Sequence, residues 1–237
     1  MALIVYELGG LKDRRYSSFS WRIRLALAHL GLDAEFRPVR VSDKQAIAFS
    51  GQSKVPILVD GDTVVYDSWR IAQHLEQQYG NAQRSLFGGA VGNGLTRMIN
   101  AWADRQVLSG AAPLVACDLI EIVDEVDAAH LRAGMEKGFG TSLEQMRDER
   151  ESRAKAFRRT IDPLRAVFKA GQPFLAGEQP AYADYIVFSI FQWARILSTF
   201  DLLDAGDEPM HVWRGRMLAL FDGLAEREPA RAAAAGA

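Results

Sequence analysis

The chain has 237 residues, 49% of them hydrophobic, so it can bury the core of one large domain or of two smaller ones. Its 28 basic and 30 acidic residues give a formal charge of -2, which provides no overall field to attract nucleic acid or an anionic membrane. Cys117 is the only cysteine, which excludes an internal disulfide, a Cys-x-x-Cys redox pair and a thiolate metal cluster.

No segment reads as a targeting or membrane-spanning sequence. The first residues form a short apolar run without a basic leader or a cleavage site, and no later apolar stretch is long enough to cross a bilayer. A chain with one cysteine suits a reducing compartment. We therefore expect a cytoplasmic protein with neither a membrane nor a nucleic-acid partner.

The first part of the chain predicts alternating strands and helices. Leu3 to Tyr6 is a β-prone run, and Trp21 to Leu30 carries apolar residues at helical spacing until Gly31 ends the pattern. A second strand is expected over Ala34 to Val41, followed by a short helix over Asp43 to Phe49.

Two short β-prone runs then flank a tight turn. Ile57 to Val59 and Thr63 to Tyr66 surround Asp60-Gly61-Asp62, and glycine readily adopts the positive φ that a hairpin turn needs. Ser68 is expected to cap a helix that runs to about Tyr79. The resulting order βαβαββα makes a complete small α/β domain, which we place at residues 1–82.

The rest of the chain predicts helices only. A segment rich in glycine, asparagine and serine separates the two parts, and we place an all-helical domain at residues 88–230. Thr141 to Ala170 is dense in charge with an apolar stripe, which predicts a long helix or a helix pair. Ala183 to Leu197 is apolar on nearly every side, as a central buried helix would be.

Four stretches together resemble the glutathione transferase superfamily: Ser17 to Arg24, Lys54 to Val59, Asp67 to Ile71, and Phe174 to Tyr185. The first is similar to zeta-type enzymes, whereas the third and fourth are closer to bacterial β-etherase-like and related fungal members. The resemblance implies a thioredoxin-like first domain, an all-helical second domain, glutathione as cofactor and a homodimer.

The resemblance implies that Ser17 is catalytic, with Ser18 as the second choice. Glutathione attacks as a thiolate, and the pKa of a free thiol lies near ~8.5, so the protein must stabilise the negative sulfur. A hydroxyl at the start of a helix can do so. The alternative is that these serines only cap the helix, and Tyr6 and Tyr16 are competing hydroxyl donors.

Two further stretches are expected to bind glutathione. Val55-Pro56 resembles the cis-proline step of the family, which frees the Val55 backbone to pair with the cysteinyl unit; the alternative is an ordinary trans proline at an edge strand. Asp67 and Ser68 are expected to bind the γ-glutamyl group, with Asp67 facing its ammonium and the helix start facing its carboxylate. The family more often has glutamate at the Asp67 position.

The remaining site residues are predicted only from their positions along the chain. The resemblance suggests that Arg40, Lys44 and Lys54 meet the glycyl carboxylate, and that Tyr16, Trp102 and Trp193 line a pocket for the electrophile. The alternative for the tryptophans is a place in the core. The four histidines have no ligand spacing, so no metal site is expected.

Three functions remain open at this point. The first is a transferase that attacks a hydrophobic, aromatic electrophile, including cleavage of an aryl ether. The second is a zeta-like glutathione-dependent isomerase, although Phe19 stands where zeta-type members usually carry a cysteine. The third is a non-catalytic binding protein of the same fold, in which Ser17 is only a cap.

Overall fold

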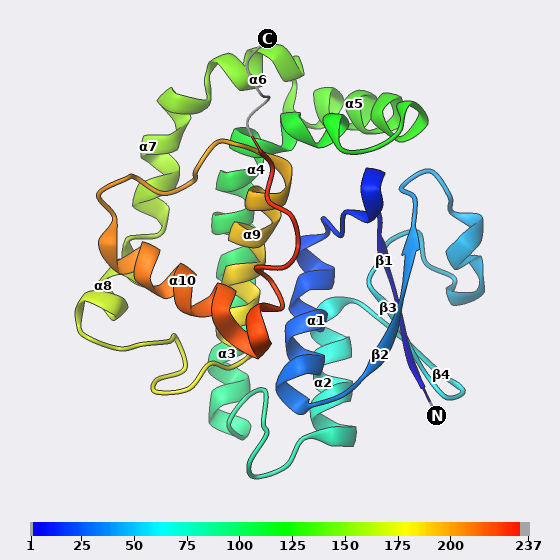
Figure 1. Ribbon diagram of the computed structural model, residues 1–237, viewed down its shortest axis with the longest axis vertical. Helices are drawn as coiled ribbons and strands as arrows, with labels where there is room; N and C mark the ends of the chain where they lie inside the picture. The colour runs from blue at the N-terminus through cyan, green and yellow to red at the C-terminus, as the bar shows by residue number, and fades with distance from the viewer. Residues whose placement is uncertain (1, 233–237) are drawn as a thin grey trace.

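A computed structural model of the chain describes residues 2–232. An α/β domain lies beside a larger helical domain, and α1 and α2 lie between the sheet and the other helices (Figure 1). This confirms the predicted fold class. The elements of the α/β domain are β1 (Leu3–Leu8), the short η1 (Leu11–Asp13), α1 (Ser18–Leu30), β2 (Ala34–Val39), the 3-10 helix η2 (Gln45–Ser50), β3 (Ile57–Asp60), β4 (Thr63–Tyr66) and α2 (Ser68–Tyr79).

The sheet has the strand order β2-β1-β3-β4, with β2 parallel to β1 and the other neighbouring pairs antiparallel. Tyr6 pairs with Ile57, and Ile57 pairs with Tyr66. The ends of β1, β2 and β4 and the start of β3 therefore meet at one edge, which we call the carboxyl edge. The loops that leave this edge carry most of the predicted site.

Local signals define both helices of the α/β domain. Ser17 is the N-cap of α1, and Gly31, at φ 69, ends the helix in the left-handed conformation that glycine adopts readily. One expectation is corrected at α2, where Asp67 rather than Ser68 is the N-cap. Its carboxylate accepts hydrogen bonds from the amides of Trp69 and Arg70, and Ser68 is the first helical residue.

The helical domain has more breaks than the sequence predicted. Its elements are α3 (Ala90–Trp102), a π-helical turn η3 (Ala103–Leu108), α4 (Ser109–Val115), η4 (Ala116–Glu121), α5 (Glu125–Phe139), α6 (Leu143–Asp148), α7 (Arg150–Thr160), α8 (Asp162–Lys169), α9 (Tyr182–Leu197) and α10 (Glu208–Gly223). The segment from Thr141 to Ala170 forms three short helices instead of one or two. Pro163, which has no amide hydrogen, stands in the first turn of α8, where a continuous α7 could not accommodate it.

The central helix of the second domain is α9, as expected. All of its residues are buried except Trp193 and Arg195, which are half-buried. The Asp184 carboxylate accepts hydrogen bonds from the amides of Leu175 and Ala181. Ala181 has no side-chain acceptor for the return bond, so only the aspartate half of a capping box is made.

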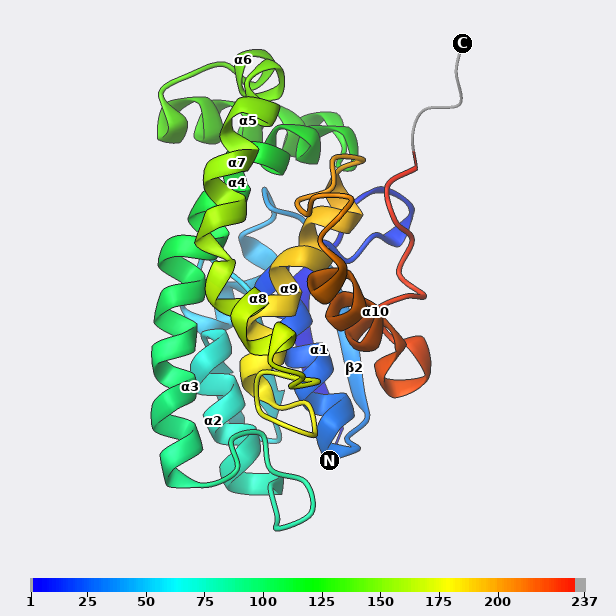
Figure 2. The same ribbon diagram turned by 90° about the vertical axis from the view of Figure 1, so that its left-hand side faces the viewer.

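Buried polar contacts join the two domains. Arg22 of α1 is fully buried and donates to Asn100 and Asp104 on the helical side. The Tyr182 hydroxyl donates to the Ser68 carbonyl at 2.9 Å. At the end of the molecule toward which β1 runs, α5 and α6 project beyond the carboxyl edge (Figures 1 and 2). Within residues 2–232, no helix is both long enough and apolar enough to cross a membrane.

Candidate functional site

Three of the predicted stretches meet at the carboxyl edge. Ser17 follows the loop that leaves β1, Val55-Pro56 comes directly before β3, and Asp67 comes directly after β4. The pairing of Ile57 with Tyr6 and with Tyr66 fixes this neighbourhood through the backbone of the sheet.

Ser17 is placed at the positive end of α1. Its side chain is 7% exposed, and its Oγ accepts a hydrogen bond from the Ser20 amide at 3.3 Å. Because the oxygen is the acceptor in this bond, the hydroxyl hydrogen stays available to donate to a ligand. Ser18 lies in the first turn of the same helix and is 6% exposed. A negative charge beside this helix end is favoured by the helix dipole.

The Val55-Pro56 peptide bond is cis. Pro56 is buried, whereas Val55 is half-buried. Among residues 2–232, neither the amide nor the carbonyl of Val55 takes part in a hydrogen bond within the protein. This peptide can therefore pair with an extended ligand as a neighbouring strand would.

Asp67 has the unusual φ of 71 for a non-glycine residue, at the junction of β4 and α2. Its Oδ1 accepts from the amides of Trp69 and Arg70, both at 3.1 Å. The side chain is exposed, and Oδ2 takes no partner in the described part of the chain. One carboxylate oxygen thus caps α2 while the other remains open to a cationic group.

The predicted cations differ in how far they are already paired. Arg40 forms an ion pair with Asp124 at 2.5 Å. Lys44 donates to the Ser53 carbonyl at 3.0 Å. Lys54 is exposed, and it forms no ion pair within residues 2–232. Lys54 is therefore the freest of the three to meet a ligand carboxylate.

The three aromatic residues predicted to line the electrophile pocket differ in burial. Tyr16 is 2% exposed, and its ring packs against Gly10. There is no space for a side chain at Gly10, because its Cβ would lie 2.4 Å from the Ile122 carbonyl oxygen. Burial raises the pKa of Tyr16, and the nearby charges of Asp127 and Asp124 raise it further. Trp102 and Trp193 are half-buried and pack against the main core, and none of the three side chains lines either of the two cavities described below.

A different hollow lies beside the carboxyl edge. A cavity of about 380 Å³ opens between α5 and Val41, the second residue after β2, and its apolar wall includes Leu131, Met135 and Phe139. The sequence patterns did not single out these residues. Their four-residue spacing on one helix face was the signal that could have found them.

Asp127 holds this part of the helical domain against the α/β domain. Its carboxylate accepts from the amides of Val41 at 3.1 Å and of Ser42 at 2.9 Å. Burial opposes ionisation of Asp127, but the hydrogen bonds from Ser42 and Val41 and the charge of Arg40 outweigh it and lower the pKa. The contact of α5 with Val41 and Ser42 is therefore made by an ionised carboxylate.

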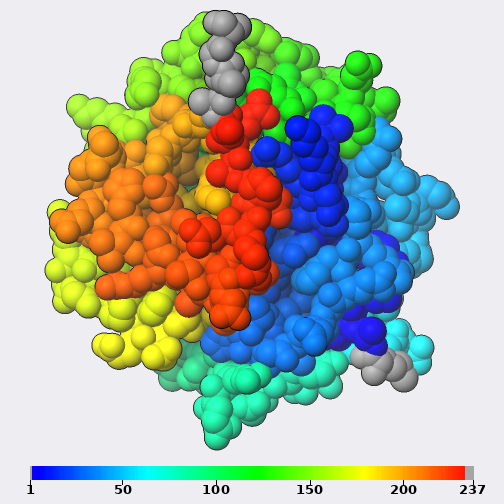
Figure 3. Space-filling model, in the orientation of Figure 1, coloured from blue at the N-terminus to red at the C-terminus, as the bar shows by residue number. Residues whose placement is uncertain are grey.

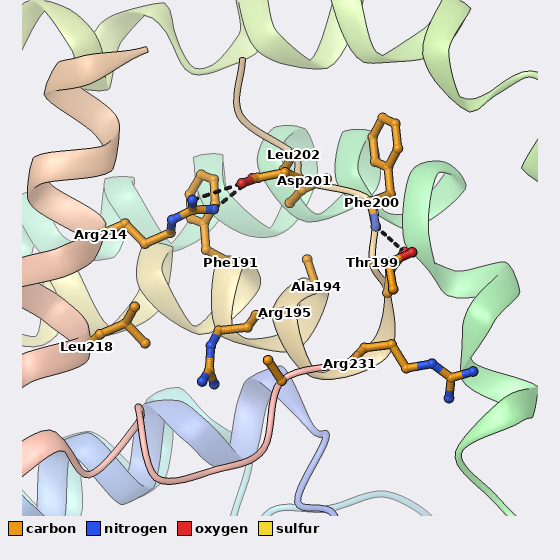
Figure 4. A pocket seen from close by; sticks show the side chains of 12 residues that line it. Phe191, Ala194, Arg195, Thr199, Phe200, Asp201, Leu202, Arg214, Leu218 and Arg231 are labelled. Atoms are coloured by element: carbon orange, nitrogen blue, oxygen red, sulfur yellow. Dashed lines mark hydrogen bonds and ion pairs between the residues drawn. The ribbon is translucent and has the colours of Figure 1, made fainter. Parts of the chain in front are cut away.

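Another cavity, of about 430 Å³, lies apart from these residues, between α9, α10 and the last described residues of the chain (Figure 4). Arg214 and Asp201 form a two-bond ion pair at its rim, with N–O distances of 2.7 and 2.9 Å. Within residues 2–232, no group of three or more histidine, cysteine or acidic side chains is arranged to hold a metal ion.

Two family models match the chain. The model described as glutathione S-transferase, N-terminal domain, covers residues 11–83, and the model described as glutathione S-transferase, C-terminal domain, covers residues 94–213. Together with the fold, they define the class of this protein: the chain belongs to the glutathione S-transferase family.

Curated relatives and solved structures agree with this family. Glutathione S-transferase Z1 of Arabidopsis thaliana is 32% identical over 143 residues, which cover 55% of this chain and 61% of that relative. The alignment thus spans about three-fifths of the relative's length. A zeta-class glutathione S-transferase of Euphorbia esula is 38% identical over 68 residues, 27% of this chain and 30% of that relative.

Two fungal structures share the fold across nearly the whole chain. Glutathione transferase GSTFuA2 of Phanerochaete chrysosporium superposes with a TM-score of 0.76 at 21% identity, covering 98% of this chain and 100% of that one. The glutathione S-transferase CsGST63524 of Ceriporiopsis subvermispora, solved in complex with glutathione, gives a TM-score of 0.79 at 17% identity, covering 94% and 97%.

Proposed function

We propose that this protein is a glutathione transferase in which the Ser17 hydroxyl stabilises the glutathione thiolate for attack on a hydrophobic, aromatic electrophile. The observation that carries the proposal is the hydrogen bonding of the Ser17 hydroxyl. Its oxygen accepts from the Ser20 amide at the start of α1, so its hydrogen is free to donate at the carboxyl edge.

The energy that this step requires is within reach of the site. Lowering the thiol pKa by about two units takes about 2.7 kcal/mol of preferential thiolate stabilisation. A hydrogen bond to a charged group contributes about 1.5–3 kcal/mol, and the end of a 13-residue helix adds up to about 1 kcal/mol. Ser17 together with the α1 dipole therefore suffices.

The rest of the site is assigned to holding glutathione. The unpaired backbone of Val55 receives the cysteinyl unit, the open oxygen of Asp67 receives the γ-glutamyl ammonium, and the start of α2 at Ser68 receives its carboxylate. Lys54 is the cation assigned to the glycyl carboxylate, because Arg40 and Lys44 have partners in the protein.

We assign the electrophile to the cavity between α5 and Val41. Its volume of about 380 Å³ fits a small aromatic molecule, and Leu131, Met135 and Phe139 make its wall apolar. An aryl ether is one electrophile of suitable shape and polarity. The domain limits that we propose, 1–82 and 88–230, place this cavity at the contact between the two domains.

A zeta-like isomerase is the second candidate. It is favoured by the Ser17-Ser18 pair and by the 32% identity to the Arabidopsis thaliana relative named Z1. In an isomerase glutathione adds to a double bond and leaves again, so it is not consumed. Product analysis separates this function from conjugation.

The test is turnover by wild type, Ser17→Ala and Ser18→Ala with a chlorodinitrobenzene, an aryl ether and a cis-alkene diacid. At pH 7 we expect Ser17→Ala to lose about 25-fold in kcat/KM, because a rise of the thiol pKa from about 6.5 to ~8.5 lowers the thiolate fraction from about 0.76 to about 0.03. Ser18→Ala should lose less than about 5-fold. Isomerisation of the alkene without loss of glutathione would favour the second candidate. If wild type turned over none of these substrates, the result would favour the non-catalytic binding protein.

We also propose a symmetric cytoplasmic homodimer. Val91, Leu95 and Met98 share one face of α3 and are 78%, 63% and 60% exposed. Such a row of exposed apolar side chains is typical of a covered surface. Sedimentation of wild type and Leu95→Glu tests it: a dimer that dissociates in the variant supports the proposal, and a wild-type monomer at micromolar concentration contradicts it.

A further inference from the structure

The chain after α10 returns to the α/β domain. Residues 224–232, which we call the C-terminal segment, lie between α10 and the first residues of the chain on the face drawn in Figure 3. On α9, Gln192 donates to the Ala225 carbonyl at 2.8 Å, and the Arg231 amide donates to the Arg195 carbonyl at 2.9 Å. The Arg195 guanidinium donates to the Glu228 carbonyl at 2.7 Å.

Hydrogen bonds, more than apolar packing, hold this segment. Ala225 is its only buried residue, and the cavity of about 430 Å³ lies behind part of it, bordered by Leu218, Ala230 and Arg231 (Figure 4). A segment with little buried apolar area is placed by its specific polar contacts. Single side chains therefore decide where it lies.

One of these contacts reaches the loop that carries the proposed catalytic serine. The Glu228 carboxylate accepts a hydrogen bond from the Arg15 amide at 3.0 Å. The Arg15 carbonyl in turn accepts from Nε1 of the buried Trp21 at 2.6 Å. The peptide groups on both sides of Arg15 are thus fixed, one by the C-terminal segment and one by α1.

The charged groups around this contact explain why Glu228 binds the Arg15 amide rather than the Arg15 side chain. The Arg15 guanidinium is paired with Glu7 at 2.9 Å and with Asp13 at 2.6 Å, and Glu7 is also bound by Arg24 and is 1% exposed. Burial raises the pKa of Glu228, as does the charge of Glu7, whereas the Arg15 amide and the positive charges of Arg24 and Arg15 lower it. Because the Arg15 side chain is paired with Glu7 and Asp13, Glu228 binds the main chain of this loop instead.

We propose that Glu228 is a positioning residue: through the Arg15 amide, the C-terminal segment fixes the loop that sets the Ser17 hydroxyl. This rests on the proposed function, since it concerns the placement of the same hydroxyl. Arg15 stands only two residues before Ser17, and a hydrogen bond to a thiolate depends on ångström-scale placement. A distant terminus thereby controls the thiol chemistry without touching glutathione.

The experiment compares wild type with Glu228→Ala, Glu228→Gln and the matched control Glu226→Ala. Glu226 is an exposed neighbour on the same segment whose carboxylate forms no hydrogen bond or ion pair within residues 2–232. Two quantities are measured on the full chain: hydrogen exchange of the Arg15 amide, and the pKa of the thiol of bound glutathione. A merely structural role would not move the second quantity.

In Glu228→Ala we expect Arg15 exchange to rise at least about 10-fold and the thiol pKa to rise by about one unit, with the KM for glutathione changed less than about 2-fold. Glu228→Gln keeps an acceptor oxygen and should shift the thiol pKa by less than half as much. Glu226→Ala should match wild type in both measurements.

Two results would overturn the role of Glu228. One is an unchanged thiol pKa in Glu228→Ala, whether or not the Arg15 amide exchanges faster. The other is an equal shift in Glu226→Ala, which would reflect the charge of the segment rather than the contact. Failure of the proposed function looks different, because wild type itself would then leave the thiol pKa at its free value.

Discussion

The two domains hold their important side chains in different ways. At the carboxyl edge of the α/β domain, Ser17 and Asp67 are placed by bonds to amides only two or three residues away. In the helical domain and at the domain contact, Asp184, Arg22 and Asp127 are placed by partners distant in sequence. The glutathione side of the site is thus built locally, whereas its position against the helical domain depends on long-range polar contacts.

The largest loss of stability is expected at Asp184, which binds nearby amides as well as the more distant Trp213. Its buried carboxylate accepts from the amides of Leu175, Ala176 and Ala181 and from Nε1 of Trp213. Asp184→Ala leaves these donors without a partner and should lower the free energy of unfolding by about 4 kcal/mol. Urea unfolding measures it.

Asp184→Asn is the matched comparison for that variant. It keeps one acceptor oxygen and should lose clearly less than Asp184→Ala. Equal losses in the two variants would mean that side-chain volume, and not hydrogen bonding, holds this end of α9.

The next largest effect is expected at the domain contact. Arg22 donates to Asp104 at 2.6 Å, to Asn100 at 3.2 Å and to Ser189 at 3.3 Å. Breaking a buried ion pair costs about 3–5 kcal/mol, and Asp104 is 32% exposed, so Arg22→Met should lose about 3 kcal/mol. The exposed Arg105→Met is the control, and an equal loss there would contradict this assignment.

A smaller effect that depends on pH is expected from Asp127. Its pKa in the folded protein lies below the ordinary value of 3.8, so its contribution to stability is present above that value and is lost as the pH falls through the lower folded value. Below about pH 4, wild type should lose roughly 1–2 kcal/mol more than Asp127→Asn. Thermal unfolding from pH 7 to pH 3 measures this difference.

The control for the pH series is Asp148→Asn, because Asp148 is exposed. It should keep the pH dependence of wild type. If Asp127→Asn also keeps that dependence, the contact of α5 with Val41 and Ser42 does not stabilise the domain pair through its charge.

The smallest expected effect is a gain of stability at the start of α9. Ala181 is the N-cap of α9 in an extended conformation, and its side chain has no acceptor. The Asp184 amide already donates to the Ala181 carbonyl at 2.9 Å, so Ala181→Ser offers it a second acceptor and should raise the free energy of unfolding by about 0.5 kcal/mol. An unchanged or lower stability would show that this helix start is fully held by Asp184 and its distant partners.

The sequence predicted the locally placed features better than the distant ones. The cap at Ser17, the end of α1 at Gly31 and the hairpin around Gly61 each depend on a few neighbouring residues, and the structure has all three. The sequence predicted Ser68 as the N-cap of α2, whereas the N-cap is Asp67. Serine and aspartate are equally common at this position, so only the backbone conformation, with a φ of 71 at Asp67, distinguishes them.

The contacts of α5 and of the C-terminal segment were not predicted. Nothing near Asp127 or Glu228 in the sequence indicates that their carboxylates bind the amides of Ser42 and Arg15, 85 and 213 residues away. The apolar face of α5 was visible in the spacing of its side chains, but the strand end that it covers became known only from the fold.

The most direct test of the account is the absorbance of the thiolate of bound glutathione as a function of pH, in wild type and in Ser17→Ala. The account predicts that wild type lowers the thiol pKa by about two units and that Ser17→Ala returns it toward the free value near ~8.5. If both proteins bind glutathione and lower its thiol pKa equally, Ser17 is only the cap of α1, and another group stabilises the thiolate.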